Sequence, residues 1–431
     1  MNNDFILALD LGTDTLKVAY GFNNNGVLEF GKITNENNYI TGSFNASAYY
    51  DEAQKKWYYA DEIDNNFIDD FYNVVKIKNL LSLLAKRKDN SIADKNEYYF
   101  TEEHYFPKYY FPQRISILNN FETMVNKKMT FTAYNTPYDV CKGYFDYVSK
   151  IIKEQIYAIM NKNKVSLKVS IVLIYPTGYG MYYVNKLKDI IESSFGYHVE
   201  MYLNSTRAVS YSAIFTEKLQ VNDEALIFDI GEEKTSVLKV NVRKKDEISI
   251  DSSEGHLAPA NIGGYTIDED ILKKINNSIG QIPIFGSQST EFNEQPLESH
   301  QYKLINDIKL AKMMLSTKNY ESLSIDVVRE LIYNVDFNQM MLREIVNGNF
   351  LDLISKYIIK ELKLSSNENV TKVILTGGPI ETSKLFYLLK IAINIKFPKV
   401  VVYKVDYSID NIIILFIIPL KIMNILFIQQ H

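Results

Sequence analysis

The chain has 431 residues, of which 46% are hydrophobic and 23% are charged, as in an ordinary soluble globular protein with room for two domains. Its net charge of −5 argues against non-specific nucleic-acid binding, which requires a clustered basic surface. The single cysteine, Cys141, excludes an internal disulfide, and the five scattered histidines indicate no histidine-based site.

The first predicted element is a hairpin over residues 5–20, in which two apolar runs flank a polar turn. Asp10 ends the first run, where its carboxylate can hold a hydrated Mg²⁺ ion. Gly12 lets backbone N–H groups approach an anion, and the hydroxyls of Thr13 and Thr15 add further donors. A turn of this kind also occurs in plain hairpins, so by itself it indicates a phosphate site only weakly.

The rest of the first half alternates between helix and strand signals, which is typical of α/β layers. A helix is predicted near residues 74–84 and includes Lys78, and a polar, aromatic insertion follows over 86–115. Thr136 and Pro137 then mark the start of a helix that extends to about Asn161. The elements predicted after it are a strand over 169–176, a helix over 183–195, a strand over 199–203 and a helix from the Asn204 cap to about Thr216.

The second half begins with a repeat of the hairpin pattern. Residues 225–240 contain an apolar strand, Asp229, Gly231, a turn, Thr235 and a second apolar strand. Asp229 lies 219 positions after Asp10, about half the length of the chain. The recurrence of a D-x-G hairpin at this spacing strengthens the interpretation as a phosphate-binding turn.

Further elements of the second half follow in order. A turn at residues 262–264 opens a helix to about Asn277, and a polar loop covers 280–298. A strand over 373–376 leads directly into Gly377 and Gly378. Helices are also predicted near 300–316, 326–332 and 338–363.

The two ends of the chain bear on its location. Residues 1–4 lack the basic segment of a signal peptide. Residues 412–428 are almost wholly apolar but contain Pro419 and Lys421, which makes a poor membrane span. The sequence therefore predicts a cytoplasmic protein without a membrane segment.

Two D-x-G hairpins at half-chain spacing, followed by a strand that ends in Gly-Gly, resemble the actin-like ATPase superfamily. Its members include actin, sugar kinases and the heat-shock seventy (DnaK-type) chaperones. The similarity is closest to the chaperones' nucleotide-binding domain and covers about residues 5–410. Four further segments are similar to chaperone motifs, and Lys78 falls where the family has a catalytic lysine; the segments are 175–179, 203–208, 262–268 and 310–316.

The resemblance implies a two-lobed actin-like fold of duplicated ribonuclease-H-like α/β domains with a nucleotide cleft between them. The first lobe would cover residues 1–215, with an inserted subdomain over about 36–135. The second would cover 216–410, with an inserted helical subdomain over about 265–368. Residues 411–431 would be an atypical apolar tail, and no peptide-binding domain is expected.

The resemblance also implies a site for ATP or ADP with Mg²⁺. Asp10 and Asp229 would hold the metal ion, and Lys78 would act with them in catalysis. Gly12, Thr13, Thr15, Gly231 and Thr235 would contact the phosphates, and Lys312, Ser316, Gly377 and Gly378 would frame the adenosine. The expected partners are the adenine nucleotide and co-chaperone-like proteins, with no nucleic acid; the sequence predicts no oligomeric state.

The chain departs from the family pattern at several of these positions. Glu232 and Glu233 replace two glycines of the second phosphate loop, and Ser205 replaces a glutamate that orders water at the metal. Lys309, Met313 and Glu381 replace residues that contact the nucleotide in the family. Three functions therefore stay open: a chaperone-like ATPase that closes its lobes on Mg-ATP, a non-hydrolysing nucleotide-binding module and an actin-like filament former. A sugar kinase is disfavoured because no sugar-contacting carboxylate set was found.

Overall fold

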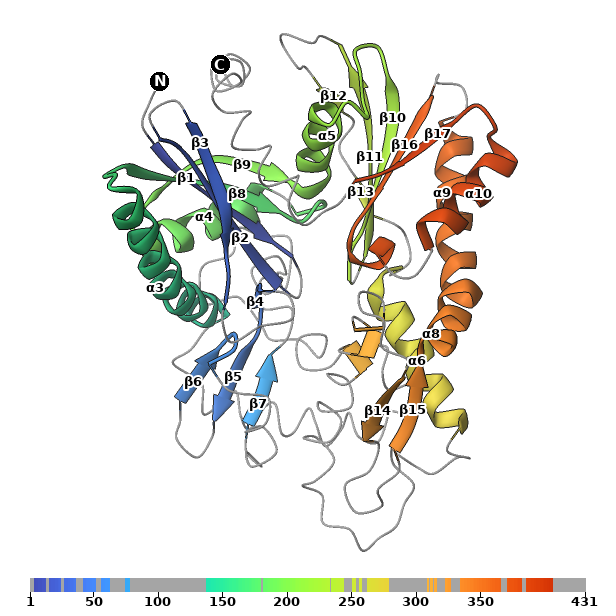
Figure 1. Cartoon of the computed structure of the whole chain (residues 1–431), viewed down its shortest axis with the longest axis horizontal. Coiled ribbons are helices and arrows are strands. Elements are labelled where there is room, and N and C mark those ends of the chain that lie inside the picture. The colour runs from blue at the N-terminus through green and yellow to red at the C-terminus, as the bar shows by residue number, and fades with distance from the viewer. Residues whose placement is uncertain are drawn as a thin grey trace, which may run out of the picture. The chain divides into compact units, whose positions relative to one another are not determined.

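The computed structural model is mixed α/β, which confirms the predicted class (Figure 1). It divides into two compact units, one of Met1–Phe67 with Asn73–Leu203 and one of Ile68–Tyr72 with Asn204–His431. The residues that the structure describes are 4–12, 15–24, 27–35, 42–51, 56–62, 74–77, 137–179, 181–232, 234–243, 250–252, 256–257, 262–278, 308–309, 311–312, 314–315, 322–326, 334–365, 370–381 and 385–405.

The first unit is built on a six-stranded sheet in the order β3-β2-β1-β8-β9, with β4 paired to β2. The central strand β1 is antiparallel to β2 and parallel to β8. The alternating side chains of β1 place Leu7 and Leu9 on one face and Asp10 on the other. The strands are β1 (Asp4–Leu11), β2 (Thr15–Asn24), β3 (Val27–Ile33), β4 (Phe44–Asn45), β8 (Lys168–Tyr175) and β9 (His198–Asn204).

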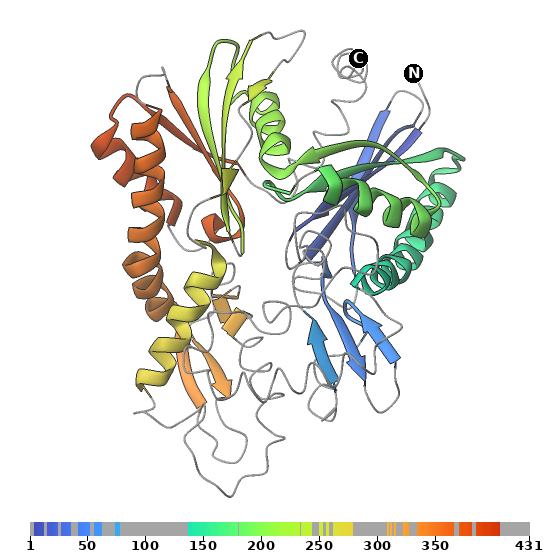
Figure 2. The ribbon, with the colours of Figure 1, turned by 180° about the vertical axis from the view of Figure 1, so that it is seen from behind.

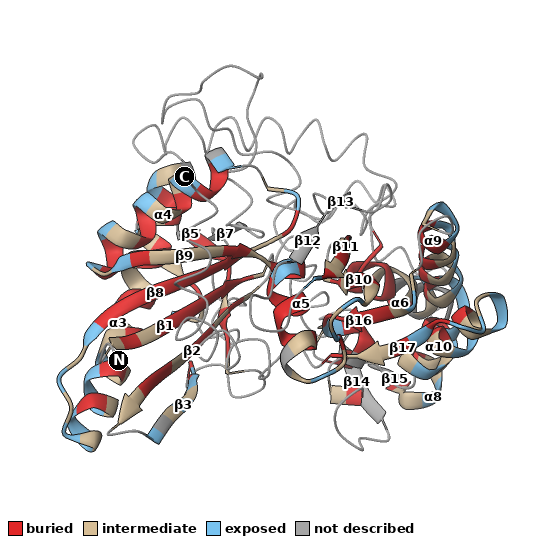
Figure 3. Ribbon diagram, turned by 90° about the horizontal axis from the view of Figure 1, so that it is seen from above, coloured by how far each residue is buried: buried red, intermediate tan, exposed pale blue. Residues whose placement is uncertain are grey.

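Helices α3 (Pro137–Asn163) and α4 (Met181–Phe195) share the core of the first unit with the Leu7 and Leu9 face of β1 (Figure 3). The predicted apolar face of α3 is buried at Val140, Tyr144, Val148, Ile152 and Ile156. The Ser149 hydroxyl and the Lys153 ammonium both donate to the Ser194 carbonyl oxygen, at 3.2 and 3.1 Å, and so join α3 to α4.

The second unit contains a sheet with the same plan, in the order β12-β11-β10-β16-β17, with β13 paired to β11 (Figure 2). Its central strand β10 is antiparallel to β11 and parallel to β16. The strands are β10 (Glu224–Ile230), β11 (Thr235–Val242), β12 (Ile250–Ser252), β13 (His256–Leu257), β16 (Lys372–Thr376) and β17 (Val401–Lys404).

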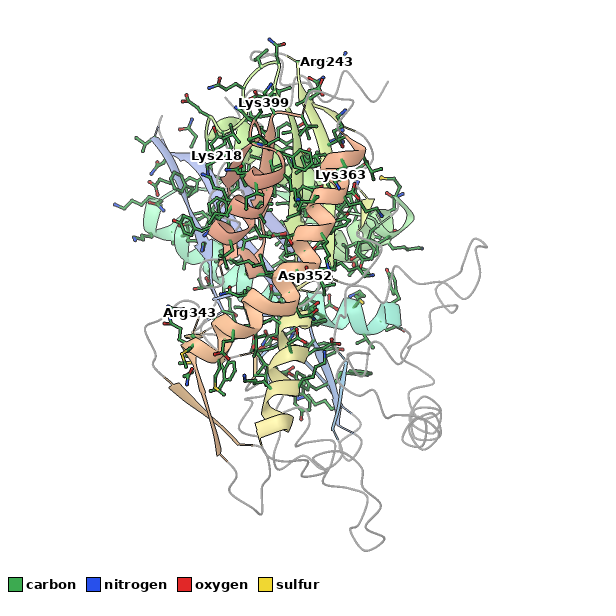
Figure 4. The ribbon with its side chains drawn as sticks, turned by 90° about the vertical axis from the view of Figure 1, so that its right-hand side faces the viewer. Lys218, Arg243, Arg343, Asp352, Lys363 and Lys399 are labelled. Carbon is green, nitrogen blue, oxygen red and sulfur yellow. The ribbon has the colours of Figure 1, made fainter. Side chains whose placement is uncertain are left out.

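Helices cover both faces of this second sheet. Helix α5 (Ser205–Phe215) begins at the predicted cap, where the Asn204 side chain accepts from the Arg207 N–H, and it packs on the Ile227 face of β10. Phe228, on the other face, lies edge-on to Tyr357 of α9 (Leu351–Leu364). Figure 4 shows Asp352 and Lys363 near the two ends of α9. The last helix of the described residues is α10 (Leu385–Lys396).

Smaller elements complete the two units. The first unit contains a three-stranded sheet of β5 (Ala48–Asp51), β6 (Lys56–Tyr59) and β7 (Val74–Ile77). The second contains the hairpin β14 (Ser322–Asp326) and β15 (Asn334–Asn338), together with α6 (Gly264–Ser278), α8 (Gln339–Ile345) and η4 (Val346–Phe350), the kinked segment between α8 and α9. No helix in the described ranges has the length and apolar character needed to cross a membrane.

One local prediction was wrong, and a second was confirmed except for a kink. Residues 74–77 form strand β7 instead of the start of a helix, because the β-branched Val74, Val75 and Ile77 fit a strand that pairs with β5. The segment predicted as a helix over 338–363 is helical, but the non-helical backbone angles of Gly348 put a kink between α8 and α9. The insertion at 86–115, the loop at 280–298 and the tail at 412–428 lie outside the described residues, as does the helix predicted at 326–332 apart from Asp326, which ends β14.

Candidate functional site

The two D-x-G hairpins have the same register. Asp10 lies opposite Lys17 in the β1–β2 pair, and Asp229 lies opposite Ser236 in the β10–β11 pair. Both members of the second pair follow their counterparts by 219 positions. Asp10 and Asp229 therefore occupy the same place on two strands that are each central to a sheet of the same order.

The turns of the two hairpins are closed by the same backbone hydrogen bond. The Gly12 N–H donates to the Thr15 carbonyl at 2.8 Å, and the Gly231 N–H donates to the Lys234 carbonyl at 2.9 Å. A Cβ at Gly12 would lie 2.9 Å from the Thr15 carbonyl oxygen. These glycines make the tight turns, but their own N–H groups already have acceptors. Phosphate contacts at the two turns would therefore come from other groups.

Thr15 and Thr235 are the two predicted hydroxyl donors that the structure describes. Thr15 begins β2 and is partly exposed. Thr235 is fully buried, and its hydroxyl donates to the Ile262 carbonyl at 2.6 Å, so it anchors the segment before α6. Thr13, Lys78 and Ser316, which the family resemblance also places at the nucleotide, lie outside the described residues.

Gly377 and Gly378 lie at the edge of the sheet where β10 ends. Thr376, the last residue of β16, is paired with Asp229. Gly377 has φ +108°, and a Cβ there would lie 2.0 Å from the Ile230 carbonyl oxygen. Only glycine allows the chain to approach β10 in this way. The structure thus brings Asp229, Gly231, Gly377 and Gly378 to one edge of the second sheet.

Lys312 lies in a group of charged side chains beside the second hairpin, which we call the lysine–carboxylate cluster and which consists of Glu232, Asp268, Lys309 and Lys312. The Lys312 ammonium is 2.7 Å from the Asp268 carboxylate and 2.9 Å from the Glu232 carboxylate. The Lys309 ammonium is 3.8 Å from the same Glu232 oxygen. Lys312 and Asp268 are buried, and Glu232 and Lys309 are partly exposed.

The turn of the second hairpin also contacts the start of α6 through its backbone. The Gly264 N–H donates to the Gly231 carbonyl at 3.0 Å, and the Tyr265 N–H donates to the Glu232 carbonyl at 2.8 Å. Two of the N–H groups that a helix leaves unpaired at its first turn are satisfied in this way. The Glu232 backbone therefore binds the hairpin turn to α6, while its side chain pairs with Lys312 and Lys309.

The charges of the cluster depend on one another. Burial raises the pKa of Asp268 to about 6, against the lowering effect of the Lys312 ammonium. Burial lowers the pKa of Lys312, but Asp268 and Glu232 raise it more, so that it lies above its ordinary value and Lys312 stays protonated. A stable positive charge is thus held beside the hairpin turn.

Sequence reasoning placed Lys312 at the adenosine and did not identify Asp268 as its partner. Asp268 is separated from Lys312 by more than 40 residues, so no local spacing connects them. One signal was present, because Lys309 and Lys312 are three residues apart and share a helix face, where they can converge on one anion.

No family model matches this chain, and the search of curated proteins likewise gave no match. The arrangement of residues in the two sheets is therefore what bears on function.

Each of the two aspartates, taken by itself, offers a carboxylate oxygen, the kind of ligand that Mg²⁺ prefers. In the described part of the chain, no three His, Cys, Asp or Glu side chains gather as a metal-binding group. Mg²⁺ in nucleotide sites commonly uses one or two carboxylates and completes its shell with water and phosphate oxygens. Asp10 and Asp229 can each contribute such a carboxylate, since each stands next to the end of a strand.

Proposed function

We propose that the chain binds adenine nucleotide with Mg²⁺ and has the two-lobed actin-like fold, closest to the nucleotide-binding domain of heat-shock seventy chaperones. The observation that carries the proposal is the equivalence of the two hairpins. The hairpins of Asp10 and Asp229 have the same strand register, the same backbone hydrogen bond across the turn and the same strand order in the surrounding sheet. A plain hairpin turn explains either one of them, but it does not explain why both recur in the same setting.

In this proposal the residues of the chain position the nucleotide and neutralise its charge, which is the main work of phosphoryl transfer. Asp10 and Asp229 would orient the waters of the metal ion. Thr13 and Thr15 would donate to phosphate oxygens, and Lys78 would add positive charge near the γ-phosphate. Gly377 and Gly378, at the edge of the second sheet, would leave room for the adenosine. Nucleotide-dependent closure of the two lobes would then be the signal to protein partners in the cytoplasm.

A nucleotide-binding module that does not hydrolyse ATP is the second candidate. Ser205 stands where the chaperone family has the glutamate that orders water at the metal ion. It is buried at the first position of α5 and follows the capping residue Asn204. A serine here cannot supply the carboxylate, so we infer that hydrolysis would be slow relative to binding.

Calorimetric titration of Mg-ATP and Mg-ADP into the full chain tests the proposal. The parent is expected to bind with micromolar affinity, and Asp10→Asn and Asp229→Asn are each expected to weaken binding at least about tenfold, because each removes one carboxylate near the phosphates. Asp139→Asn and Asp352→Asn, two exposed aspartates in the first turns of α3 and α9, make the same charge change and should bind as the parent does.

Two results would overturn the proposal: no binding to the folded parent, or undiminished binding to both hairpin variants. Release of inorganic phosphate, measured on the same samples, separates the two candidates. If the parent releases phosphate and Asp10→Asn abolishes this release, the ATPase is supported. If the parent binds ATP without releasing phosphate, the non-hydrolysing module is supported.

A further inference from the structure

The Glu232 carboxylate lies where two lysines of one helical segment converge. Its Oε1 atom is 2.9 Å from the Lys312 ammonium and 3.8 Å from the Lys309 ammonium. The Lys309 ammonium also lies 4.6 Å from the centre of the Tyr265 ring, a cation–π contact that helps to hold it at this place. An anion with several oxygens is the group that two converging ammonium ions bind best.

Two glycines allow Glu232 to lie close to the start of α6. A Cβ at Gly264 would lie 2.1 Å from the Glu232 Oε2 atom, and a Cβ at Gly263 would lie 2.6 Å from the Glu232 carbonyl oxygen. Both glycines are therefore required for the close approach of Glu232 to the start of α6. The partly exposed carboxylate thus lies against Gly264 and close to the ammonium groups of Lys312 and Lys309.

The charges show what Glu232 contributes. The lysine–carboxylate cluster contains two positive and two negative side chains. Asp268 is fully buried with its carboxylate 2.7 Å from the Lys312 ammonium, so we expect this pair to persist when Glu232 is neutral. Without the Glu232 charge, the formal charges of the other three side chains sum to one positive charge, and Lys309 is the partly exposed member of these three.

We propose that Glu232 is a built-in anion that occupies a phosphate-binding position formed by Lys309 and Lys312, so that the second hairpin accepts a phosphate group only after Glu232 is displaced. The carboxylate takes the two ammonium contacts that a phosphate oxygen would make, and it repels a phosphate that approaches while it is in place. The natural ligand, a nucleotide polyphosphate, rests on the proposed function, whereas the anion position does not.

The test uses inorganic tripolyphosphate, without metal, titrated into the full chain at low ionic strength, where charge pairing is strongest. We expect weak binding to the parent and binding at least about tenfold tighter to Glu232→Gln, which keeps the size of the side chain but removes its charge. The double variant with Glu232→Gln and Lys309→Gln should lose this gain. Lys309 is chosen because Lys312 neutralises the buried Asp268 and its replacement would unfold the site.

Glu344→Gln is the matched control, since Glu344 also belongs to a glutamate–lysine pair of the second unit, 3.2 Å from Lys274. An equal gain in this control would mean that only net charge matters, and the proposal would be wrong. It would also be wrong if a folded Glu232→Gln bound tripolyphosphate no better than the parent. Glu232→Gly is a second variant for the same titration. If neither variant folds, the lysines do not form a site without Glu232, and the inference fails.

The same experiment separates this inference from the proposed function. Tripolyphosphate contains no adenosine and is used without Mg²⁺. If Glu232→Gln binds tripolyphosphate more tightly than the parent but no variant binds ATP, only the proposed function is overturned. If the parent binds Mg-ATP and Glu232→Gln does not bind it more tightly, only the role of Glu232 is overturned.

Discussion

Glu232 stands where the resemblance leads one to expect a glycine, and its contacts explain how the fold accommodates it. A carboxylate beside a phosphate site is repulsive unless a cation lies against it. Here Lys312 and Lys309 lie against it at 2.9 and 3.8 Å. Because Lys312 also pairs with the buried Asp268, the loss of its ammonium would leave an uncompensated buried carboxylate.

Glu269, the next residue in α6, gives the structure a pH dependence. Burial raises the pKa of Glu269 from 4.5 to about 7, with Lys273 opposing and Asp270 and Asp268 adding to the rise. Between these values the folded chain holds a proton that the unfolded chain has lost. Stability therefore falls as pH rises from about 4.5 to about 7, by about 1 to 3 kcal/mol from this group. Urea denaturation at pH 5 and pH 8 measures the change.

Glu269→Gln, which resembles the protonated form, should remove this part of the pH dependence and make the chain more stable than the parent at pH 8. The exposed Glu344→Gln is the control and should keep the parent's difference between the two pH values. A Glu269→Gln variant that still loses as much stability as the parent would assign the effect to other groups.

Gly377 carries a second prediction at the scale of one residue. Its φ of +108° and the 2.0 Å approach of a Cβ to the Ile230 carbonyl oxygen leave no room for alanine. Gly377→Ala should cost at least about 2 kcal/mol of the free energy of unfolding. At the exposed Gly378 a Cβ would meet nothing within 4 Å, so Gly378→Ala should change it by less than about 0.5 kcal/mol. Equal losses in thermal or urea unfolding would contradict the strain argument.

At the scale of an element, α10 shows where periodicity fails. Its sequence is apolar nearly all round, so the pattern does not indicate which side is buried. In the structure Leu385, Leu389 and Ile393 are buried. Exposed positions on the other side are Tyr387, Ile391 and Ile395.

Leu389→Ala should therefore destabilise the chain by about 2 to 4 kcal/mol, because it opens a cavity in the core. Ile391, two residues away, is 57% exposed, so Ile391→Ala should lower the free energy of unfolding by less than about 0.5 kcal/mol. Chemical denaturation of the two variants measures both values. A loss at Ile391 as large as that at Leu389 would mean that this side of α10 is covered in the native protein.

Whole elements were predicted well where their signals are local. Pro137 begins α3, Asn204 caps α5, and both hairpins were expected from their apolar runs and turn residues. Residues 74–77 were predicted wrongly because a short apolar run fits a helix or a strand equally well until a partner strand is known. The hairpin of β14 and β15 was not predicted.

At the scale of the whole molecule, each unit has a buried core of its own and a sheet of the same strand order. The apolar residues of the two central strands differ, but the positions of Asp10 and Asp229 correspond. Many different residues can form sheets of the same strand order, provided that buried side chains alternate along each strand. This alternation does not require an aspartate at the same position in both hairpins. The proposed nucleotide site supplies a reason for the recurrence, and the titration of the two aspartate variants tests it.

The sequence by itself determined the α/β class, the two hairpins and their spacing, and the ends of several helices, because these depend on residues within a few positions of one another. The roles predicted for Lys78, Thr13 and Ser316 stay predictions. Only the tertiary structure decided that the Thr235 hydroxyl donates to Ile262, and that Glu232 lies between Lys309 and Lys312. These partners are separated by tens of residues, and the direction of a polar side chain in a turn is set by what packs against it.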